Sequence, residues 1–205
     1  TIRSCLGQTI RPHEIIVVDD CSQDGSAEVI RRFTDVAVIY NERNLGKGGA
    51  VVRGIRSAQG DILMICDADL SRLQSSHIDR LIHEYQTGKY DMVIAGRETD
   101  QGFGRLMARL SGERIFERQV IDPYLDLIAG CGNGIEQIIN FAHQGKKVKI
   151  IVSKDIGHIL KYQRTGIRGW LPAYAKEVSQ LISTELFLRK MLLTRRIFIR
   201  RKSMA

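Results

Sequence analysis

Two aspartates, Asp67 and Asp69, stand one residue apart at the end of an apolar run over 62–66. Because side chains alternate along an extended chain, the two carboxylates project to the same side if the strand conformation continues. Such a pair repels itself unless a cation lies between its members, and oxygen ligands of this kind suit Mg²⁺, Mn²⁺ or Ca²⁺. On its own the pattern leaves two interpretations open: a divalent-metal site, or solvated loop aspartates after an ordinary strand.

The segments that must position these aspartates alternate between strand-like and helix-like patterns. Apolar and β-branched runs predict strands over 14–20, 36–40, 62–66, 91–95 and 147–152. Helical spacing predicts helices over 1–8, 26–32, 48–57, 76–85, 103–121, 135–143 and from 169 onward. This alternation predicts an α/β fold with a mostly parallel central sheet covered by helices. In such sheets ligands bind beyond the carboxyl ends of the strands, where Asp20 and the two aspartates are expected.

The composition is that of a globular protein. The 205 residues, 43% hydrophobic and 26% charged, fit one domain or one domain with an appendage. No apolar stretch is long enough to span a bilayer, and no signal-peptide pattern opens the sequence. The four scattered cysteines (Cys5, Cys21, Cys66 and Cys131) predict free thiols in a reducing compartment, hence a cytoplasmic protein without a disulfide frame or zinc site.

The net charge of +8 belongs to the end of the chain. After Glu185 there are seven basic residues and no acid, and the rest of the chain has 24 bases against 23 acids. A nucleic-acid-binding domain would distribute bases over its surface and interleave aromatic residues, which make up only 6% of this chain. The charge pattern therefore disfavours a nucleic acid as partner.

Four consecutive segments resemble the nucleotide-binding half of family 2 glycosyltransferases. They are Glu-Ile-Ile-Val-Val-Asp-Asp-Cys-Ser-Gln-Asp-Gly-Ser over 14–26, Asn-Leu-Gly-Lys-Gly-Gly-Ala over 44–50, Gly-Asp at 60–61 and Asp-Ala-Asp over 67–69. Their order and spacing match the family over residues 8–97, and the match weakens beyond. The resemblance implies a GT-A fold, a nucleotide-sugar donor and a Mn²⁺ or Mg²⁺ ion held at the Asp-x-Asp.

The N-terminal segment of the sequence departs from the family pattern. Family members open with a strand followed by a Pro-x-Tyr-Asn-Glu-like segment, and residues 1–9 are similar to the helix after that strand. We therefore expect the first strand to be missing from this sequence, either truncated or absent from the structure. We expect an N-terminally incomplete GT-A domain over 1–165, followed by a basic helical appendage over 166–205.

On the donor side, the family pattern assigns roles to five residues. Asp20 matches the residue that bonds the nucleobase, and Lys47 lies where an ammonium group meets the diphosphate. Asp67 is implied to face the ribose and the metal, and Asp69 to hold the metal and so take part in catalysis. Arg97 matches an arginine that clamps a phosphate in polyprenol-phosphate sugar transferases. A UDP- or GDP-sugar is the implied donor. Turn formation by Asp20, a solvated Lys47 and an exposed Arg97 remain the alternatives.

On the acceptor side, the resemblance points to a phosphate-bearing acceptor. Ser111, Gly112 and Arg114 are similar to the Ser-Gly-x-Arg segment that meets the acceptor in glucosyl-3-phosphoglycerate synthases. The later His158-x-x-Lys161 also fits that group, in which the histidine is a further metal ligand. A surface or core histidine and a solvated arginine are the alternatives.

The catalytic base is the open question of the sequence. Inverting family members with hydroxyl acceptors carry Glu-Asp, with the aspartate as base, where this sequence has Glu136-Gln137. Glutamine cannot take a proton. Three interpretations remain: Glu136 is the base, the acceptor is already an anion such as a lipid phosphate, or the mechanism is retaining. The structural alternative is that Glu136 is only a negative charge at a helix N-terminus, stabilised there by the helix dipole.

The basic tail after residue 185 mixes apolar blocks with cations. Such a helix can lie in an anionic lipid interface, which would place the protein peripherally on the inner face of a membrane. A helix packed on the domain or on a second subunit of a homo-oligomer is the alternative. The sequence as a whole predicts a metal-dependent glycosyltransferase acting on a polyprenyl phosphate or a phosphoglycerate-like acceptor. The competing hypothesis is a nucleotide-sugar-binding module without turnover.

Overall fold

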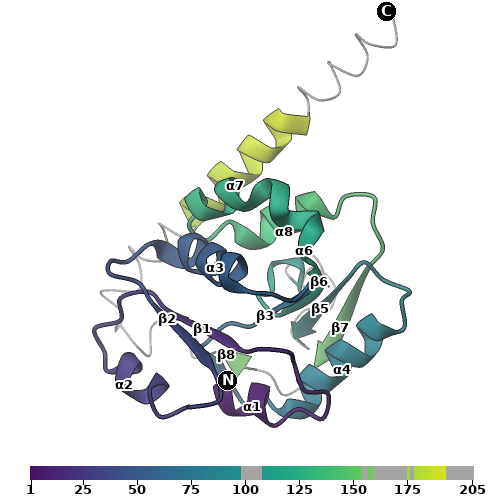
Figure 1. Ribbon diagram of the computed structural model, residues 1–205. Coiled ribbons are helices and arrows are strands. Elements are labelled where there is room, and N and C mark those ends of the chain that lie inside the picture. Colours follow the sequence, from purple (N-terminus) through teal and green to yellow (C-terminus); the bar gives the residue numbers. More distant parts are fainter. Residues whose placement is uncertain (98–107, 154–156, 159–174, 176–177, 193–205) are drawn as a thin grey trace, which may run out of the picture.

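The computed structural model describes residues 1–97, 108–153, 157–158, 175 and 178–192 (Figure 1). Its strands form three sheets. The first joins β1 (Ile16–Asp19) to β2 (Ala37–Tyr40) in parallel. The second has four strands in the order β3 (Ile62–Ile65), β6 (Arg114–Glu117), β5 (Met92–Arg97) and β7 (Val148–Ser153). The third pairs β4 (Leu70–Ser71) with β8 (Gly157–His158).

The direction of β6 determines which residues meet at one sheet edge. β6 is antiparallel to both β3 and β5, whereas β5 and β7 are parallel. β3, β5 and β7 therefore end at the edge where β6 begins. The segment just before β6 faces the aspartates that follow β3.

Helices cover both faces of the four-stranded sheet (Figure 1). In chain order the helices are α1 (Ile2–Leu6), α2 (Ser26–Ile30), α3 (Gly46–Ser57), α4 (Ser75–Gln86), α6 (Arg118–Ile121), α7 (Leu125–Gly130) and α8 (Ile135–Ala142), with 3₁₀ turns η2 (Ala108–Leu110) and η3 (Asp122–Tyr124). A further helix spans 178–192. Among the described residues, no helix combines the length and the apolar character that crossing a membrane requires.

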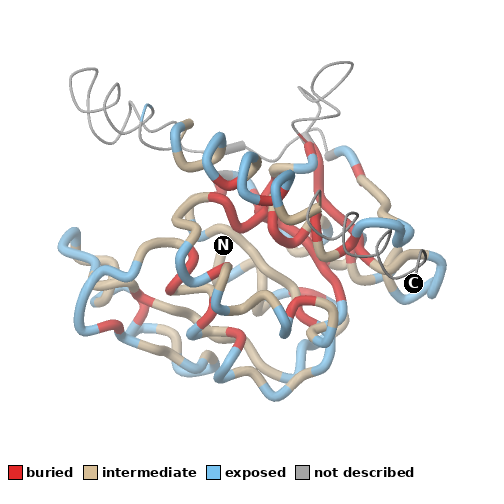
Figure 2. The backbone as a smooth tube through the Cα atoms, turned by 90° about the horizontal axis from the view of Figure 1, so that it is seen from above, coloured by how far each residue is buried: buried red, intermediate tan, exposed pale blue. Residues whose placement is uncertain are grey.

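Side chains alternate across β5 and so enter two different core clusters, while a third cluster consists of Leu70, Leu73 and Ile78. Met92 and Ile94 join the larger cluster with residues of α3, α8 and the helix over 178–192. Val93 and Ala95 join the cluster on the α4 side. Figure 2 shows the buried residues in the interior and the exposed ones along the outer loops and helices.

Most of the expected elements are confirmed, and one helix prediction is wrong. Residues 103–107 of the helix predicted over 103–121 lie outside the described residues, and 114–117 form strand β6. Both edges of β6 are hydrogen-bonded, so tertiary pairing overrides the local sequence preference. The sheet is consequently less parallel than expected. The helix predicted over 48–57 begins two residues earlier, at Gly46, so Lys47 lies in the first turn of α3.

Two expectations about organisation stay predictions. The first is that the opening strand of the family is missing; among the described residues, β1 and β3 belong to different sheets and no strand joins these sheets. The second is the division into a domain over 1–165 and an appendage over 166–205. Leu188, from the second part, is buried in the same cluster as Phe116 of β6.

Candidate active site

The strand ends bring the predicted site residues to one edge of the sheet. Asp67 follows β3, Arg97 ends β5, and Ser111 precedes β6. His158 pairs with Leu70 in the β4–β8 ladder, which places its backbone next to the Asp-x-Asp segment. The side chains of Arg97 and His158 are outside the described part of the structure, so their roles stay predictions.

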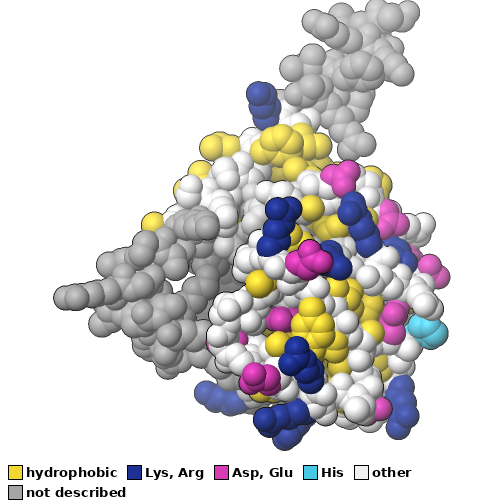
Figure 3. Space-filling model, turned by 60° about the vertical axis from the view of Figure 1, so that its left-hand side comes forward, with side chains coloured by type: hydrophobic (Ala, Val, Ile, Leu, Met, Phe, Trp, Pro, Cys, Tyr) yellow, Lys and Arg dark blue, Asp and Glu magenta, His cyan; other side chains and the backbone are white. Residues whose placement is uncertain are grey.

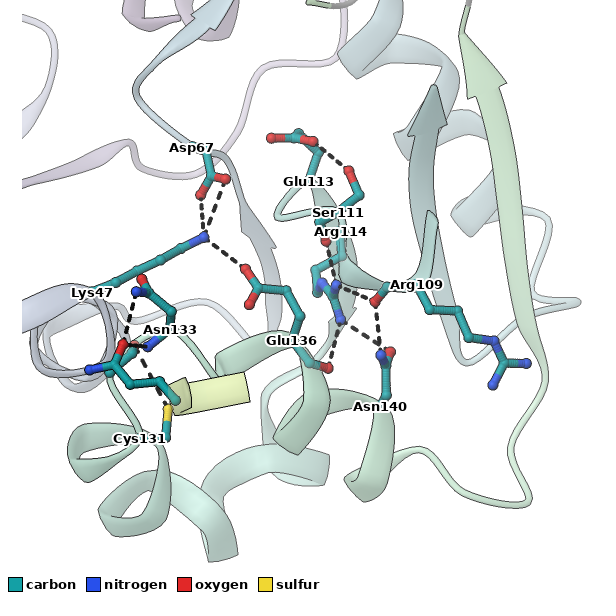
Figure 4. Close-up of polar contacts among 12 residues, drawn as sticks. Lys47, Asp67, Arg109, Ser111, Glu113, Arg114, Cys131, Asn133, Glu136 and Asn140 are labelled. Carbon is teal, nitrogen blue, oxygen red and sulfur yellow. Dashed lines mark hydrogen bonds and ion pairs between the residues drawn. The ribbon is translucent and has the colours of Figure 1, made fainter. Parts of the chain in front are cut away.

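An ion cluster of Lys47, Asp67 and Glu136 occupies this edge (Figure 4). Lys47 Nζ lies 3.0 Å from Asp67 Oδ1 and 3.2 Å from Oδ2. The same nitrogen lies 2.7 Å from Glu136 Oε1. Lys47 comes from the first turn of α3 and Glu136 from the first turn of α8, so two helix N-termini converge on the end of β3.

Two carboxylates with one ammonium leave this cluster with a net negative charge. The Glu136 side chain is only 8% exposed, so its charge needs a partner. Burial works to lower the pKa of Lys47, but the carboxylates of Glu136 and Asp67 outweigh it and raise that pKa above its usual value. Lys47 is therefore a permanent cation at neutral pH.

Close backbone approaches shape the walls of the site. A Cβ on Gly112 would lie 2.4 Å from Asp67 Oδ2, so any larger residue would have to displace this carboxylate. A Cβ on Gly48 would lie 2.1 Å from the carbonyl oxygen of Ile128, and the Gly48 N–H donates to the carbonyl of Gly132 at 3.2 Å. The α3 N-terminus is thus held against the loop that precedes α8.

Asp20 follows β1 and organises the loop before α3. Its Oδ1 accepts hydrogen bonds from Asn41 Nδ2 at 2.7 Å and from the Leu45 N–H at 2.8 Å. Arg53 of α3 donates in turn to Asn41 Oδ1 at 2.8 Å. Within the described residues, both of these side-chain hydrogen bonds go to Oδ1 of Asp20, so Oδ2 is left to accept another donor.

The predicted acceptor segment is buried. Arg114 is 0% exposed, and burial lowers its pKa to about 10 despite the neighbouring carboxylates, so it remains charged at neutral pH. Its guanidinium donates to Asn140 Oδ1 at 3.2 Å and to the backbone carbonyls of Arg109, Ser111 and Glu136. Arg114 therefore links η2, the start of β6 and the first turn of α8 (Figure 4).

Glu113 is a residue that the sequence reasoning missed. It is buried beside Ser111, whose hydroxyl donates to Glu113 Oε2 at 2.7 Å. Within the described residues Glu113 Oε1 has no hydrogen-bond partner. The sequence feature that could have indicated Glu113 is its position in Ser-Gly-Glu-Arg, where two consecutive charged residues directly precede an apolar pair.

The helix over 178–192 packs against the loop that leads into α8. Gln180 Oε1 accepts from Asn133 Nδ2 at 2.9 Å, and a Cβ on Gly134 would lie 2.3 Å from Thr184 Oγ1. Gln137 Nε2 donates to the carbonyl of Leu181 at 3.1 Å. Gln137, which stands where the family resemblance led us to expect an aspartate, is thus engaged with this helix.

The donor set suits a hard divalent cation. Asp67 already holds a cation, the Lys47 ammonium, with both carboxylate oxygens, and Asp69 follows two residues later. Among the described side chains, no group of three or more His, Cys, Asp or Glu forms a complete metal site. Asp67 and Asp69 are the residues that would hold a metal, with His158 as the predicted third ligand.

The fold is the GT-A fold of nucleotide-sugar-dependent transferases. It is similar to glucosyl-3-phosphoglycerate synthase from Mycobacterium tuberculosis in complex with Mn²⁺, UDP-glucose and glycerol 3-phosphate, with a TM-score of 0.60 and 18% identity. The similarity covers 84% of this chain and 69% of that one. The chain belongs to glycosyl transferase family 2, whose family model matches residues 1–138.

Curated relatives share about half of the chain. It is 35% identical over 117 residues to an undecaprenyl-phosphate 4-deoxy-4-formamido-L-arabinose transferase of Pectobacterium carotovorum, covering 53% of this chain and 35% of the relative. The protein of the same name from Pseudomonas aeruginosa (strain LESB58) is 36% identical over 118 residues, covering 54% and 34%. The chain thus spans about a third of the length of these relatives.

Proposed function

We propose that this protein transfers a sugar from a nucleoside-diphosphate sugar to a phosphate-bearing acceptor. The observation that carries the proposal is the ion cluster at the sheet edge, where Asp67 binds a cation through both oxygens beside Asp69. Membership of glycosyl transferase family 2 supports the reaction class.

Asp20 is the proposed contact to the nucleobase. Its carboxylate is fixed by Asn41 and Leu45 through Oδ1, which leaves Oδ2 for one ring N–H. Uracil offers a single imino N–H on this edge, whereas guanine offers two parallel donors that would use both oxygens. A UDP-sugar is therefore the donor we expect, in agreement with the UDP-glucose bound to the structural relative.

The diphosphate is proposed to lie between Asp67 and the N-terminus of α3. Lys47 supplies a cation there, and Arg97 at the end of β5 is the further phosphate contact we propose. A Mn²⁺ or Mg²⁺ ion held by Asp67 and Asp69, with His158 as third ligand, would stabilise the charge that develops on the departing nucleoside diphosphate.

The acceptor is proposed to carry a phosphate. The curated relatives are named for undecaprenyl phosphate, and relatives of known structure are glucosyl-3-phosphoglycerate synthases bound to glycerol 3-phosphate or phosphoglyceric acid. If the attacking atom is a phosphate oxygen, as in a lipid phosphate, it is already ionised and needs no general base; a retaining mechanism would also need none. This agrees with Glu136 being ion-paired to Lys47 and with Gln137 bonding to the helix over 178–192. Ser111, Gly112 and Arg114 remain the proposed acceptor segment, in which the buried Arg114 would act by holding the segment through the carbonyls of Arg109 and Ser111.

A position on the inner face of a membrane is part of the proposal. On the helix over 178–192, Ile182 is 56% and Leu186 62% exposed, and the sequence after residue 185 carries only positive charge. Figure 3 shows hydrophobic side chains grouped near the top of the molecule, where this helix leaves the domain. An apolar face flanked by cations suits an anionic lipid surface.

The test is a nucleoside-diphosphate release assay. The protein is incubated with Mn²⁺ and a panel of UDP- and GDP-sugars, alone, with polyprenyl phosphate and with 3-phosphoglycerate. We expect release of UDP that requires both the metal and one of the phosphate acceptors. Metal-dependent UDP binding without release under any condition would favour the binding-module hypothesis. An absence of metal-dependent binding of every nucleoside diphosphate would overturn the proposal.

A further inference from the structure

We infer that Lys47 is a built-in counter-cation that occupies Asp67 until the donor arrives, so that the divalent metal binds tightly only together with the diphosphate. The inference rests on the proposed function, and it adds an order of binding and a second task for Glu136. It follows from the contacts of three charged side chains contributed by α3, the end of β3 and α8.

Lys47 holds the oxygens that a metal at Asp67 would need. Its Nζ lies 3.0 Å from Oδ1 and 3.2 Å from Oδ2, so the ammonium contacts both oxygens of the carboxylate. Like charges at this spacing repel strongly in a partly buried site. An ammonium and a divalent cation therefore compete for Asp67.

Asp67 has little freedom to avoid this competition. The backbone of Gly112 lies against its carboxylate, with only 2.4 Å between Oδ2 and the position of a Cβ on Gly112. The carboxylate already fills the space beside Gly112, so Lys47 is the partner better able to withdraw. Lys47 has a flexible four-carbon stem. It follows Gly46, which has a φ of +76° and no atom within 4 Å of its Cβ position.

Glu136 keeps Lys47 in the site during the exchange. Its contact with Lys47, at 2.7 Å, is shorter than either contact to Asp67. When Lys47 leaves Asp67, the diphosphate offers a new anionic partner, while Glu136 still holds the ammonium on its other side. Glu136 is thus a positioning residue, because it acts on the donor through Lys47.

The experiment measures Mn²⁺ binding without activity, by electron paramagnetic resonance, with and without UDP. In the wild-type protein we expect weak binding of Mn²⁺ alone and much tighter binding with UDP. Lys47→Met removes the charge and keeps the stem, so it should bind Mn²⁺ alone about tenfold tighter than the wild type and gain less from UDP. Lys47→Arg retains a cation and should stay close to the wild type.

Three further variants locate the effect. Lys146→Met removes an exposed lysine outside the site and should leave Mn²⁺ binding unchanged. Lys47→Met/Glu136→Gln should keep the gain, because the gain comes from Asp67; loss of the gain would assign the new site to Glu136 and overturn the inference. Lys47→Gln provides a second uncharged replacement if the methionine variant is not folded.

The failures of the two proposals are distinguishable. If the wild type binds UDP with Mn²⁺ but the uncharged Lys47 variants bind Mn²⁺ alone no better, the inference is wrong and the proposed function stands. If the wild type shows no metal-dependent UDP binding, the proposed function is wrong and the inference falls with it.

Discussion

Gly112 lies directly against the carboxylate of Asp67, where a Cβ would be 2.4 Å from Oδ2 and 2.6 Å from Cγ. Gly112→Ala should therefore displace Asp67 without opening the core. We expect Mn²⁺-dependent UDP binding to weaken roughly tenfold, the effect of misplacing a group beside a metal site. Isothermal titration calorimetry measures the binding, and a thermal melt checks that the fold is retained.

Gly130→Ala is the matched control for this substitution. Gly130 ends α7, and a Cβ there would meet no atom within 4 Å. Its binding and melting temperature should match the wild type. Unchanged UDP binding by Gly112→Ala would mean that the position of Asp67 does not determine donor affinity.

Asp69→Ala should abolish metal-dependent donor binding while the protein stays folded. Loss of a metal ligand should exceed the roughly 10–100-fold cost of losing a supporting residue. The measurement is UDP affinity with Mn²⁺ and with a chelator, where the two values should become equal in the variant. Asp126→Ala, which removes an exposed acid paired with Arg56, is the control. A variant that still binds UDP more tightly with Mn²⁺ would refute the metal assignment.

Asp20→Asn should weaken binding of the nucleoside itself. Asparagine keeps an oxygen for Asn41 and Leu45, so the loop should hold, but the NH₂ group that replaces Oδ2 cannot accept the ring N–H. Losing a hydrogen bond to a charged group costs about 1.5–3 kcal/mol, or roughly 10–100-fold. The loss should appear for uridine as well as UDP, whereas Asp69→Ala should leave uridine binding intact. Equal uridine affinity in wild type and Asp20→Asn would remove Asp20 from the nucleobase site.

The strand ends of this fold could be predicted from the sequence because their signal is local. An apolar run closing in acids identified β1 and β3, and the positions of Asp20, Asp67 and Asp69 followed from it. β6 could not be predicted in this way. Its four residues include Arg114 and Glu117, and it exists because β3 and β5 pair with it on both edges.

The contact between Lys47 and Glu136 also could not be predicted from local sequence patterns. The two residues are far apart in sequence and lie on the first turns of two helices. Each was named as a candidate separately, Lys47 as a contact to the donor and Glu136 as a possible catalytic base. Only the packing of α3 against the loop before α8, through Gly48 and Gly132, brings them together.

His143 should make the stability of the protein depend on pH. Burial lowers the pKa of His143, Lys146 and Arg114 lower it further, and its contact with the Ile139 carbonyl and the charge of Asp91 act in the opposite direction. The unfolded chain therefore binds a proton at a higher pH than the folded protein. The stability that His143 contributes is complete above the unfolded pKa of about 6.5 and is lost as the pH falls toward the folded value.

Urea unfolding at about pH 8 and about pH 5 tests this. The free energy of unfolding should fall between the two, and His143→Gln should reduce the fall because the replacement does not titrate. His83→Gln, at an exposed position on α4, should keep the wild-type pH dependence. An equal fall in wild type and His143→Gln would show that other groups carry the effect.

Replacing two exposed apolar residues of the helix over 178–192 should release the protein from anionic membranes. Ile182→Glu/Leu186→Glu puts charges on a face that is 56% and 62% exposed, so the core should be unaffected. Co-sedimentation with phosphatidylglycerol vesicles should be strong for the wild type, weak for the variant and reduced by salt, because the basic tail adds electrostatic attraction. Phosphatidylcholine vesicles should bind neither protein well.

Val29→Glu controls for the added charge at an apolar residue, since Val29 is 52% exposed on α2, away from this helix (Figure 1). It should sediment with anionic vesicles like the wild type. Analytical ultracentrifugation without vesicles tests the other occupant of the apolar face. A dimer that the Ile182→Glu/Leu186→Glu variant cannot form, together with no vesicle binding by the wild type, would assign the face to a second copy of the chain and contradict the membrane proposal.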